Sequence, residues 1–218
     1  MKGSLIKIYN KVGIKSMRTQ NIAKHIGWSS FYKAGSLIAN FTLVPLTLEY
    51  LDAENYGVWL TLSSFIGWFA FFDIGLGNGL RNKFAEAKTL GNHLDAQAYV
   101  STAYFTIGSI SLGILILFLS LNSFIDWTIV FNTKANLSGE LSLLLPVIFT
   151  FFCLQLVAKL ITSIYQANQQ HSIQDRVQFI GQVLSLLAIW LITKTTNSSL
   201  LIFGLIFSAL PLLILIIL

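Results

Sequence analysis

The chain has 218 residues, of which 55% are hydrophobic and only 11% are charged, whereas charged residues make up about 25% of an ordinary soluble domain. This composition excludes a water-soluble globular protein, because the chain contains several apolar stretches of the roughly 20 residues that cross a bilayer. The net charge of +5 could suggest nucleic acid, but six of the fourteen basic residues lie directly before the first apolar stretch. Basic residues in that position set membrane topology and attract anionic lipids, so no nucleic acid is expected as a partner.

Residues 1–25 form the first predicted unit, a basic lead-in on the cytoplasmic side. Its basic residues recur at helical spacing, which favours an amphipathic helix over a disordered tail. The segment lacks the short apolar core and the small-residue cleavage site of a secretory signal peptide. The residues at helical spacing are Lys7, Lys11, Lys15 and Arg18.

Six apolar stretches follow, and residues 26–218 are therefore predicted to form an all-α bundle of six transmembrane helices. The expected spans are 26–51, 56–76, 97–121, 141–168, 177–193 and 199–218. The last span continues to the final residue as an unbroken apolar run, without the polar anchors that usually flank a span. We therefore expect either the N-terminal part of a longer protein or a truncated gene product.

The charges of the loops predict the orientation of these spans. The second-to-third connection contains Arg81, Lys83 and Lys88, and the fourth-to-fifth connection contains Arg176. The first-to-second loop, 49–55, is in contrast purely acidic. Because cytoplasmic loops carry an excess of Lys and Arg, the N-terminus and the basic connections are expected in the cytoplasm.

Polar side chains form stripes along three predicted helices when positions are counted at 100° per residue. Two explanations stay open: interhelical hydrogen bonds that hold the spans together, or the lining of a water-filled cavity. Continuous rows favour the cavity, because isolated polar residues suffice to join helices. The stripes are Ser29, Lys33, Ser36, Asn40 and Thr47 on the first span, Gln155, Lys159, Thr162, Gln166, Gln169 and Gln170 on the fourth, and Asp175, Gln178, Gln182 and Ser185 on the fifth.

Three of the charges within predicted spans need an explanation, because a charge at the bilayer centre costs about 2.5 to 3.5 kcal/mol on insertion scales. Lys33 either faces the cavity or extends its stem towards the cytoplasmic interface. Lys159 lies in the middle of its stripe, where it is expected to face the cavity and attract a phosphate or uronic acid group. Asp73 lies near the predicted end of the second span, where the helix dipole disfavours negative charge. It should therefore pair with Lys33 or Arg81, or carry a coupling proton or cation.

The segment after Asp73 contains the closely spaced glycines Gly75, Gly77 and Gly79. No predicted strand precedes them, so they do not form a dinucleotide-binding motif. They are expected to end the second span, and a basic interfacial helix is expected at 80–88. Because no catalytic constellation and no metal-ligand spacing stands out, neither enzymatic activity nor a metal or other cofactor is predicted.

A succession of motifs resembles a known family. Residues 45–51 (Pro-Leu-Thr-Leu-Glu-Tyr-Leu) lead into 55–59 (Asn-Tyr-Gly-Val-Trp), and 72–83 (Phe-Asp-Ile-Gly-Leu-Gly-Asn-Gly-Leu-Arg-Asn-Lys) follow. This succession resembles the oligosaccharide flippases of polysaccharide biosynthesis, the Wzx or O-antigen translocase type, in the multidrug/oligosaccharidyl-lipid/polysaccharide exporter superfamily. The motifs identify the family but not the glycan.

The resemblance implies the N-terminal lobe of a two-lobe transporter, in which two lobes rock around a central cationic cavity. Such proteins move an undecaprenyl-diphosphate-linked oligosaccharide from the cytoplasmic to the periplasmic leaflet of a bacterial inner membrane, coupled to an ion gradient such as protons or sodium. Expected partners are this lipid-linked oligosaccharide, membrane lipids, and also a polysaccharide polymerase or glycosyltransferases. The candidate cavity residues are Lys33, Asn40, Arg81, Gln155, Lys159, Gln166, Gln178 and Gln182.

Two other functions remain as alternatives. A cation-coupled multidrug exporter of the same superfamily would need an acidic cavity, whereas the stripes here offer mainly Lys and Gln. A membrane scaffold would instead recruit a glycosyltransferase through the basic lead-in, without transporting anything itself.

Overall fold

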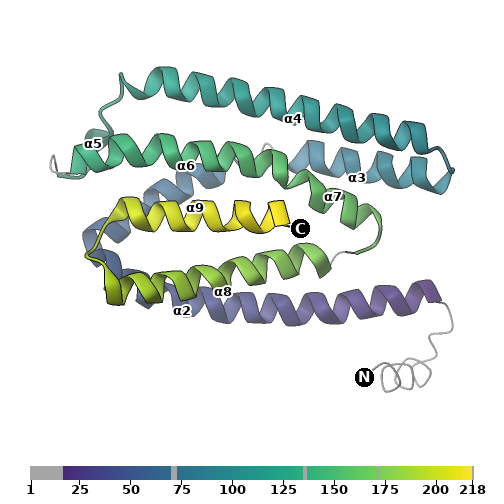
Figure 1. Ribbon diagram of the computed structural model, residues 1–218, viewed down its shortest axis with the longest axis horizontal. Coiled ribbons are helices and arrows are strands. Elements are labelled where there is room, and N and C mark those ends of the chain that lie inside the picture. The colour runs from purple at the N-terminus through teal and green to yellow at the C-terminus, as the bar shows by residue number, and fades with distance from the viewer. Residues whose placement is uncertain (1–16, 70–72, 135–136, 171, 218) are drawn as a thin grey trace.

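The computed structural model describes residues 17–69, 73–134, 137–170 and 172–217, and its regular elements within these ranges are all helices. Figure 1 shows them stacked with their axes nearly parallel, in the spatial order α2, α8, α9, α6 and α4. The all-α prediction is therefore confirmed. The helices are α2 (Met17–Phe69), α3 (Asp73–Thr89), α4 (His93–Asn122), α5 (Trp127–Val130), α6 (Ser138–Ala158), α7 (Leu160–Ala167), α8 (Ser172–Thr195) and α9 (Leu200–Ile217).

Helix α2 consists of two segments that meet at Asp52, whose φ of 65° is not helical. The Asp52 carboxylate accepts the backbone N–H groups of Glu54 and Asn55 at 2.9 and 3.0 Å, as the N-terminal cap of a new helix does. The chain reverses at this cap, and the second segment runs back towards α3 (Figure 1). The predicted division between the first and second spans therefore lies at one capping residue.

Five helical stretches in the described ranges are long and apolar enough to cross a membrane: Lys24–Gly67, His93–Asn122, Ser138–Ala167, Ser172–Thr195 and Leu200–Ile217. The first stretch is divided at Asp52, so it accounts for two of the six predicted spans. The stretch Ser138–Ala167 contains α6 and α7, which are separated at Lys159. A helical membrane bundle is thus confirmed.

Of the lead-in, 17–25 continues directly into the first span, and 1–16 lie outside the described residues.

The region after the second span differs from the prediction. One helix, α3, begins at Asp73 and continues through the three glycines to Thr89, so these glycines neither end a span nor precede a separate helix at 80–88. Glycine inside a helix is tolerated where packing compensates for it, and α3 buries Leu80 and Ala87 where it packs against α4 and α7. Asp73 begins α3 instead of ending the second span. Its side chain lies outside the described residues, so its pairing with Lys33 or Arg81 and its coupling role stay predictions.

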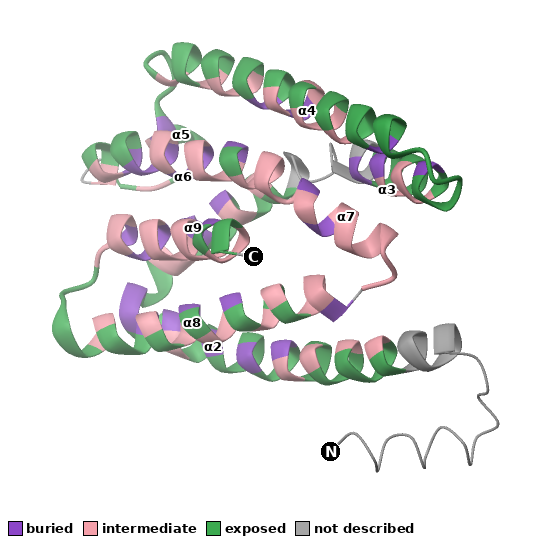
Figure 2. Ribbon diagram, turned by 45° about the vertical axis from the view of Figure 1, so that its right-hand side comes forward, coloured by how far each residue is buried: buried purple, intermediate pink, exposed green. Residues whose placement is uncertain are grey.

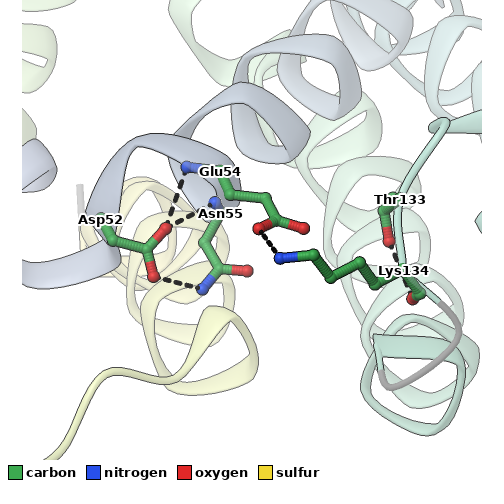
Figure 3. Close-up of polar contacts among 5 residues, drawn as sticks. All are labelled: Asp52, Glu54, Asn55, Thr133 and Lys134. Carbon is green, nitrogen blue, oxygen red and sulfur yellow. Dashed lines mark hydrogen bonds and ion pairs between the residues drawn. The ribbon is translucent and has the colours of Figure 1, made fainter.

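The loops gather at two opposite ends of the bundle, as the predicted alternation requires. The α3–α4 and α7–α8 connections lie at the end where α2 begins, which we call the tail end (Figure 1). At the opposite end, Lys134 forms an ion pair with Glu54 at 2.6 Å, next to the Asp52 cap (Figure 3). There the Tyr50 hydroxyl also donates to the carbonyl of Asn197 at 3.1 Å, which ties α2 to the α8–α9 loop.

The core lies where α6 and α9 pack together with the Asp52 region of α2. Phe203 of α9 is fully buried and packs edge-on against Trp59, with ring centroids 4.8 Å apart. Gly204 allows the backbone of α9 to approach α6, because a Cβ at this position would lie 2.6 Å from Leu144. Small residues permit such close approach between membrane helices. Figure 2 shows in contrast that α4 leaves most of its surface exposed.

Glu140 fixes the start of α9 against α6. Its carboxylate accepts the backbone N–H of Leu201 at 2.7 Å and the Ser199 hydroxyl at 2.9 Å. The first N–H groups of a helix have no partner within it, and the helix dipole favours a negative charge at that end. Glu140 therefore supplies from a neighbouring helix the cap that α9 needs.

We expect Gly204→Leu to lower the free energy of unfolding by about 1 to 3 kcal/mol, because the added side chain overpacks the α6–α9 interface. The matched control is Gly113→Leu on α4, where a Cβ would meet no atom within 4 Å. Thermal unfolding of the purified protein in detergent measures both variants. If the two variants melt at the same temperature, close packing at Gly204 is not a determinant of stability.

Candidate functional site

The candidate site is a network of polar side chains around the first turns of α8, at the tail end of the bundle. Asp175 lies in the first turn of α8 and accepts a hydrogen bond from the Ser29 hydroxyl of α2. The Lys33 ammonium lies 3.9 Å from the same carboxylate. The Asp175 side chain is only 14% exposed, whereas the Lys33 side chain is 68% exposed. The lysine is therefore anchored at one edge of the network while its charge remains accessible.

Gln166 of α7 connects this part of α8 to α3. Its amide nitrogen donates to the side-chain oxygen of Gln174, the residue before Asp175. Its own oxygen accepts from the Arg81 guanidinium at 3.4 Å. Arg81 is half-buried, and it comes from a helix that the sequence placed on the membrane surface. Arg81 of α3 is therefore linked through Gln166 to the part of α8 that also contacts Lys33 of α2.

Lys159 lies at the break between α6 and α7, two turns before Gln166. Its carbonyl accepts both the backbone N–H and the hydroxyl of Thr162, at 2.9 and 2.7 Å. These short-range bonds divide the predicted fourth span into two helices. The Lys159 side chain is half-buried, so it is not turned fully outward from the bundle.

Gln155 lies one turn before Lys159 and faces α9. Its amide donates to the Ser208 carbonyl at 2.8 Å. Both residues line a cleft of about 320 Å³ between the second segment of α2, α6 and α9. The remaining walls are mostly apolar and include the rings of Trp59, Phe152 and Phe207.

The other predicted residues have different environments. Asn40 and Gln178 are exposed on α2 and α8, and neither has a side-chain bond in the described network. Gln182 has a buried side-chain oxygen without a hydrogen-bond partner among the described residues. An unsatisfied buried acceptor costs about 1 to 3 kcal/mol, so this oxygen is suited to bind a water or a small donor group. The Asp73 side chain lies outside the described part of the chain.

Two partners in the network and one helix cap outside it were not singled out in the sequence. Gln174 is the acceptor for Gln166, and Ser172 lies 2.5 Å from His25 of α2. Glu140 caps α9 at the opposite end. Gln174 and Ser172 lie in the predicted α7–α8 loop, so the periodicity of the stripes did not include them. Glu140 directly precedes the fourth predicted span, and its acidic side chain in this position was the sequence feature that could have indicated a capping role.

The network combines two cations with neutral amides and one carboxylate. Such a set can bind an anionic group through Lys33 and Arg81 and exchange hydrogen bonds with hydroxyl groups, since each Gln is both a donor and an acceptor. No group of three or more His, Cys, Asp or Glu residues suited to a metal ion occurs among the described residues. All three predicted stripes serve in part as interhelical contacts, through the Ser29–Asp175 and Gln155–Ser208 bonds.

Comparison with known proteins finds two relatives that are named for O-antigen export or transport. The chain is 32% identical over 108 residues to a Yersinia pseudotuberculosis protein named as a candidate O-antigen export protein, a match that covers 50% of this chain and 24% of the relative. It is 29% identical over 148 residues to a candidate O-antigen transporter of Salmonella typhi, covering 63% of this chain and 33% of the relative. The matched segments therefore make up only about a quarter to a third of these relatives.

These similarities confirm the resemblance to the O-antigen translocases that the motifs indicated. Both relatives are named for export or transport, which agrees with the expectation that the chain is not an enzyme. No family model and no solved structure matches the chain.

We expect Asp175→Ala to lower the free energy of unfolding by about 1 to 3 kcal/mol, because it removes the acceptor of the Ser29 hydroxyl and a negative charge from the start of α8. Lys33→Ala should lower it by less than about 1 kcal/mol, since an exposed ion pair contributes little. Unfolding in detergent, followed by tryptophan fluorescence, compares the two. Equal losses would show that the ion pair, rather than the hydrogen bond, holds α2 to α8.

Proposed function

We propose that the chain forms one lobe of a transporter that moves a lipid-linked oligosaccharide across a bacterial inner membrane. The substrate is an O-antigen unit on undecaprenyl diphosphate, and it moves from the cytoplasmic to the periplasmic leaflet. The single observation that carries this proposal is the accessible cation network, Lys33 and Arg81 around the start of α8, in a membrane bundle similar to O-antigen transporters.

The charge distribution supports the direction of transport. The tail end contains residues 17–25 of the basic lead-in and the Arg81 and Lys33 network, and the positive-inside rule assigns this end to the cytoplasm. An anionic diphosphate that approaches from the cytoplasmic leaflet would therefore meet the cations first. Hydrogen bonds from Gln166, Gln178 and Gln182 would then bind sugar hydroxyls, because amides supply both donors and acceptors.

Lys159 occupies the central position in this mechanism. It lies at the α6–α7 break, between Gln155 in the last turn of α6 and Gln166 in the tail-end network. A lysine at that depth would bind the diphosphate as it moves inward from Lys33 and Arg81, since charge-assisted hydrogen bonds to phosphate are the strong ones. Alternating access requires a second lobe, which the remaining part of a longer protein or a second copy of this chain would supply.

The energy for transport would come from a proton or sodium gradient. Asp73 is the candidate coupling group, because carboxylates within membrane proteins commonly carry protons or cations. A multidrug exporter is the weaker alternative, since the tail-end network presents two cations for one carboxylate, and drug cations would be repelled.

Lys159→Ala should abolish export of the polysaccharide while leaving the amount of protein in the membrane unchanged, because it removes the central phosphate-binding charge. The measurement is complementation of a host that lacks the gene, with surface polysaccharide detected on gels. Lys194→Ala is the matched control, since this lysine lies in the last turn of α8 at the opposite end of the bundle. Normal export by the Lys159 variant would exclude this residue from the mechanism.

Deleting residues 1–16 distinguishes the transporter from a scaffold. A transporter should keep partial export, because the cation network lies in 29–175, beyond the deleted segment. A scaffold that recruits a glycosyltransferase through its basic lead-in should lose its role completely. Measuring export together with membrane levels of the shortened protein separates the two functions.

A further inference from the structure

A groove lies between the last turns of α3 and the first turns of α4, at the tail end of the bundle (Figure 1). It has a volume of about 590 Å³, and one wall is apolar, formed by Phe84, Ala96 and Val100. Lys88, His93 and Gln97 supply polar groups to the same groove. It is separate from the proposed transport site, because none of these residues takes part in the network around α8.

The charge of the groove lining is positive. The Lys88 ammonium donates to the neutral side-chain oxygen of Asn168 at 2.5 Å, and no carboxylate among the described residues forms an ion pair with it. The two carboxylates nearby in sequence are engaged by other groups: Glu86 pairs with Lys83 at 2.9 Å, and Asp95 accepts the Asn92 amide at 2.6 Å. The pairing with Glu86 also raises the pKa of Lys83. Lys88 therefore remains available to bind an anion.

The length of α4 places this groove at the depth of lipid headgroups. Its 30 residues extend about 45 Å at 1.5 Å per residue, whereas the hydrocarbon core is about 30 Å thick. Most of the exposed large apolar side chains of α4, such as Phe105, Leu112 and Leu119, lie in its later turns, and only Leu94 and Tyr99 among the described ones lie before residue 102. We therefore place the first turns, 93–101, which contain the polar residues His93, Asp95 and Gln97, beyond the hydrocarbon in the headgroup region.

We infer that the groove binds an anionic glycerophospholipid. The phosphate lies between Lys88 and His93, and the first carbons of an acyl chain lie against Phe84 and Val100. Charge and shape both favour this occupant, because basic pockets between membrane helices bind anionic headgroups. A neutral lipid lacks the net negative charge that Lys88 would attract, and a free phosphate would make no contact with the apolar wall. The bound lipid would join α3 to α4 at the membrane surface.

The test is native mass spectrometry of the full chain in a neutral detergent, with dioleoylphosphatidylglycerol or dioleoylphosphatidylcholine added. We expect the protein to retain phosphatidylglycerol in preference to phosphatidylcholine. Lys88→Gln should weaken phosphatidylglycerol binding about fivefold, the effect of about one basic residue near a membrane surface. The matched control is Lys24→Gln, which removes an equal charge from an exposed position of α2 at the tail end, outside the groove, and should leave binding unchanged.

Two further variants separate lipid binding from a structural role. Asn168→Ala removes the Lys88 contact but not the charge, and it should leave phosphatidylglycerol retention intact. Ser101→Trp fills the groove without changing its charge, and it should reduce retention as strongly as Lys88→Gln.

Three outcomes would overturn the proposal. Unchanged retention by Lys88→Gln would remove the phosphate contact, and unchanged retention by a folded Ser101→Trp variant would indicate general attraction to a basic surface. Displacement of phosphatidylglycerol by inorganic phosphate, but not by chloride at the same ionic strength, would indicate a site for free anions instead of a lipid.

Discussion

The structure depends on the need of every polar group in the hydrocarbon region to find a partner inside the protein. Water is absent there, so an unpaired backbone or side-chain group costs several kcal/mol. Ser111 of α4 donates to the Cys153 carbonyl of α6 at 2.8 Å, and Gln155 of α6 donates to the Ser208 carbonyl of α9. With Glu140 capping α9, these bonds fix α4, α6 and α9 relative to one another.

The same requirement explains how one set of side chains can both hold helices together and bind a ligand. Asp175 is largely buried because Ser29 satisfies it, and this pairing holds Lys33 at the edge of the network with its charge exposed. Gln166 similarly joins α7 to α8, because its side-chain nitrogen donates to Gln174, while its side-chain oxygen accepts from Arg81. The proposed transport site is therefore positioned by the contacts that stabilise the bundle.

The two ends of the bundle differ in how closely individual lysines are paired with carboxylates. At the Asp52 end, Lys134 forms an ion pair with Glu54 (Figure 3). The carboxylate raises the pKa of this lysine and compensates its positive charge. At the tail end, Lys33 is only loosely paired and Lys88 contacts a neutral amide. This asymmetry agrees with the orientation that the loop charges favour, and it leaves Lys33 and Lys88 accessible to anionic groups.

Hydropathy and charge in the sequence were sufficient for the helical class, the approximate positions of the spans and the alternation of the loops, because the bilayer imposes a length and a composition on each span. The sequence also singled out Lys33, Arg81 and Gln166 as candidates, since charges and amides are rare in such segments. The tertiary structure decided which residues meet. Helical periodicity places a residue on a face but does not identify the neighbouring helix, so the bonds of Gln174 and Glu140 and the continuity of α3 through its glycines emerged only from packing.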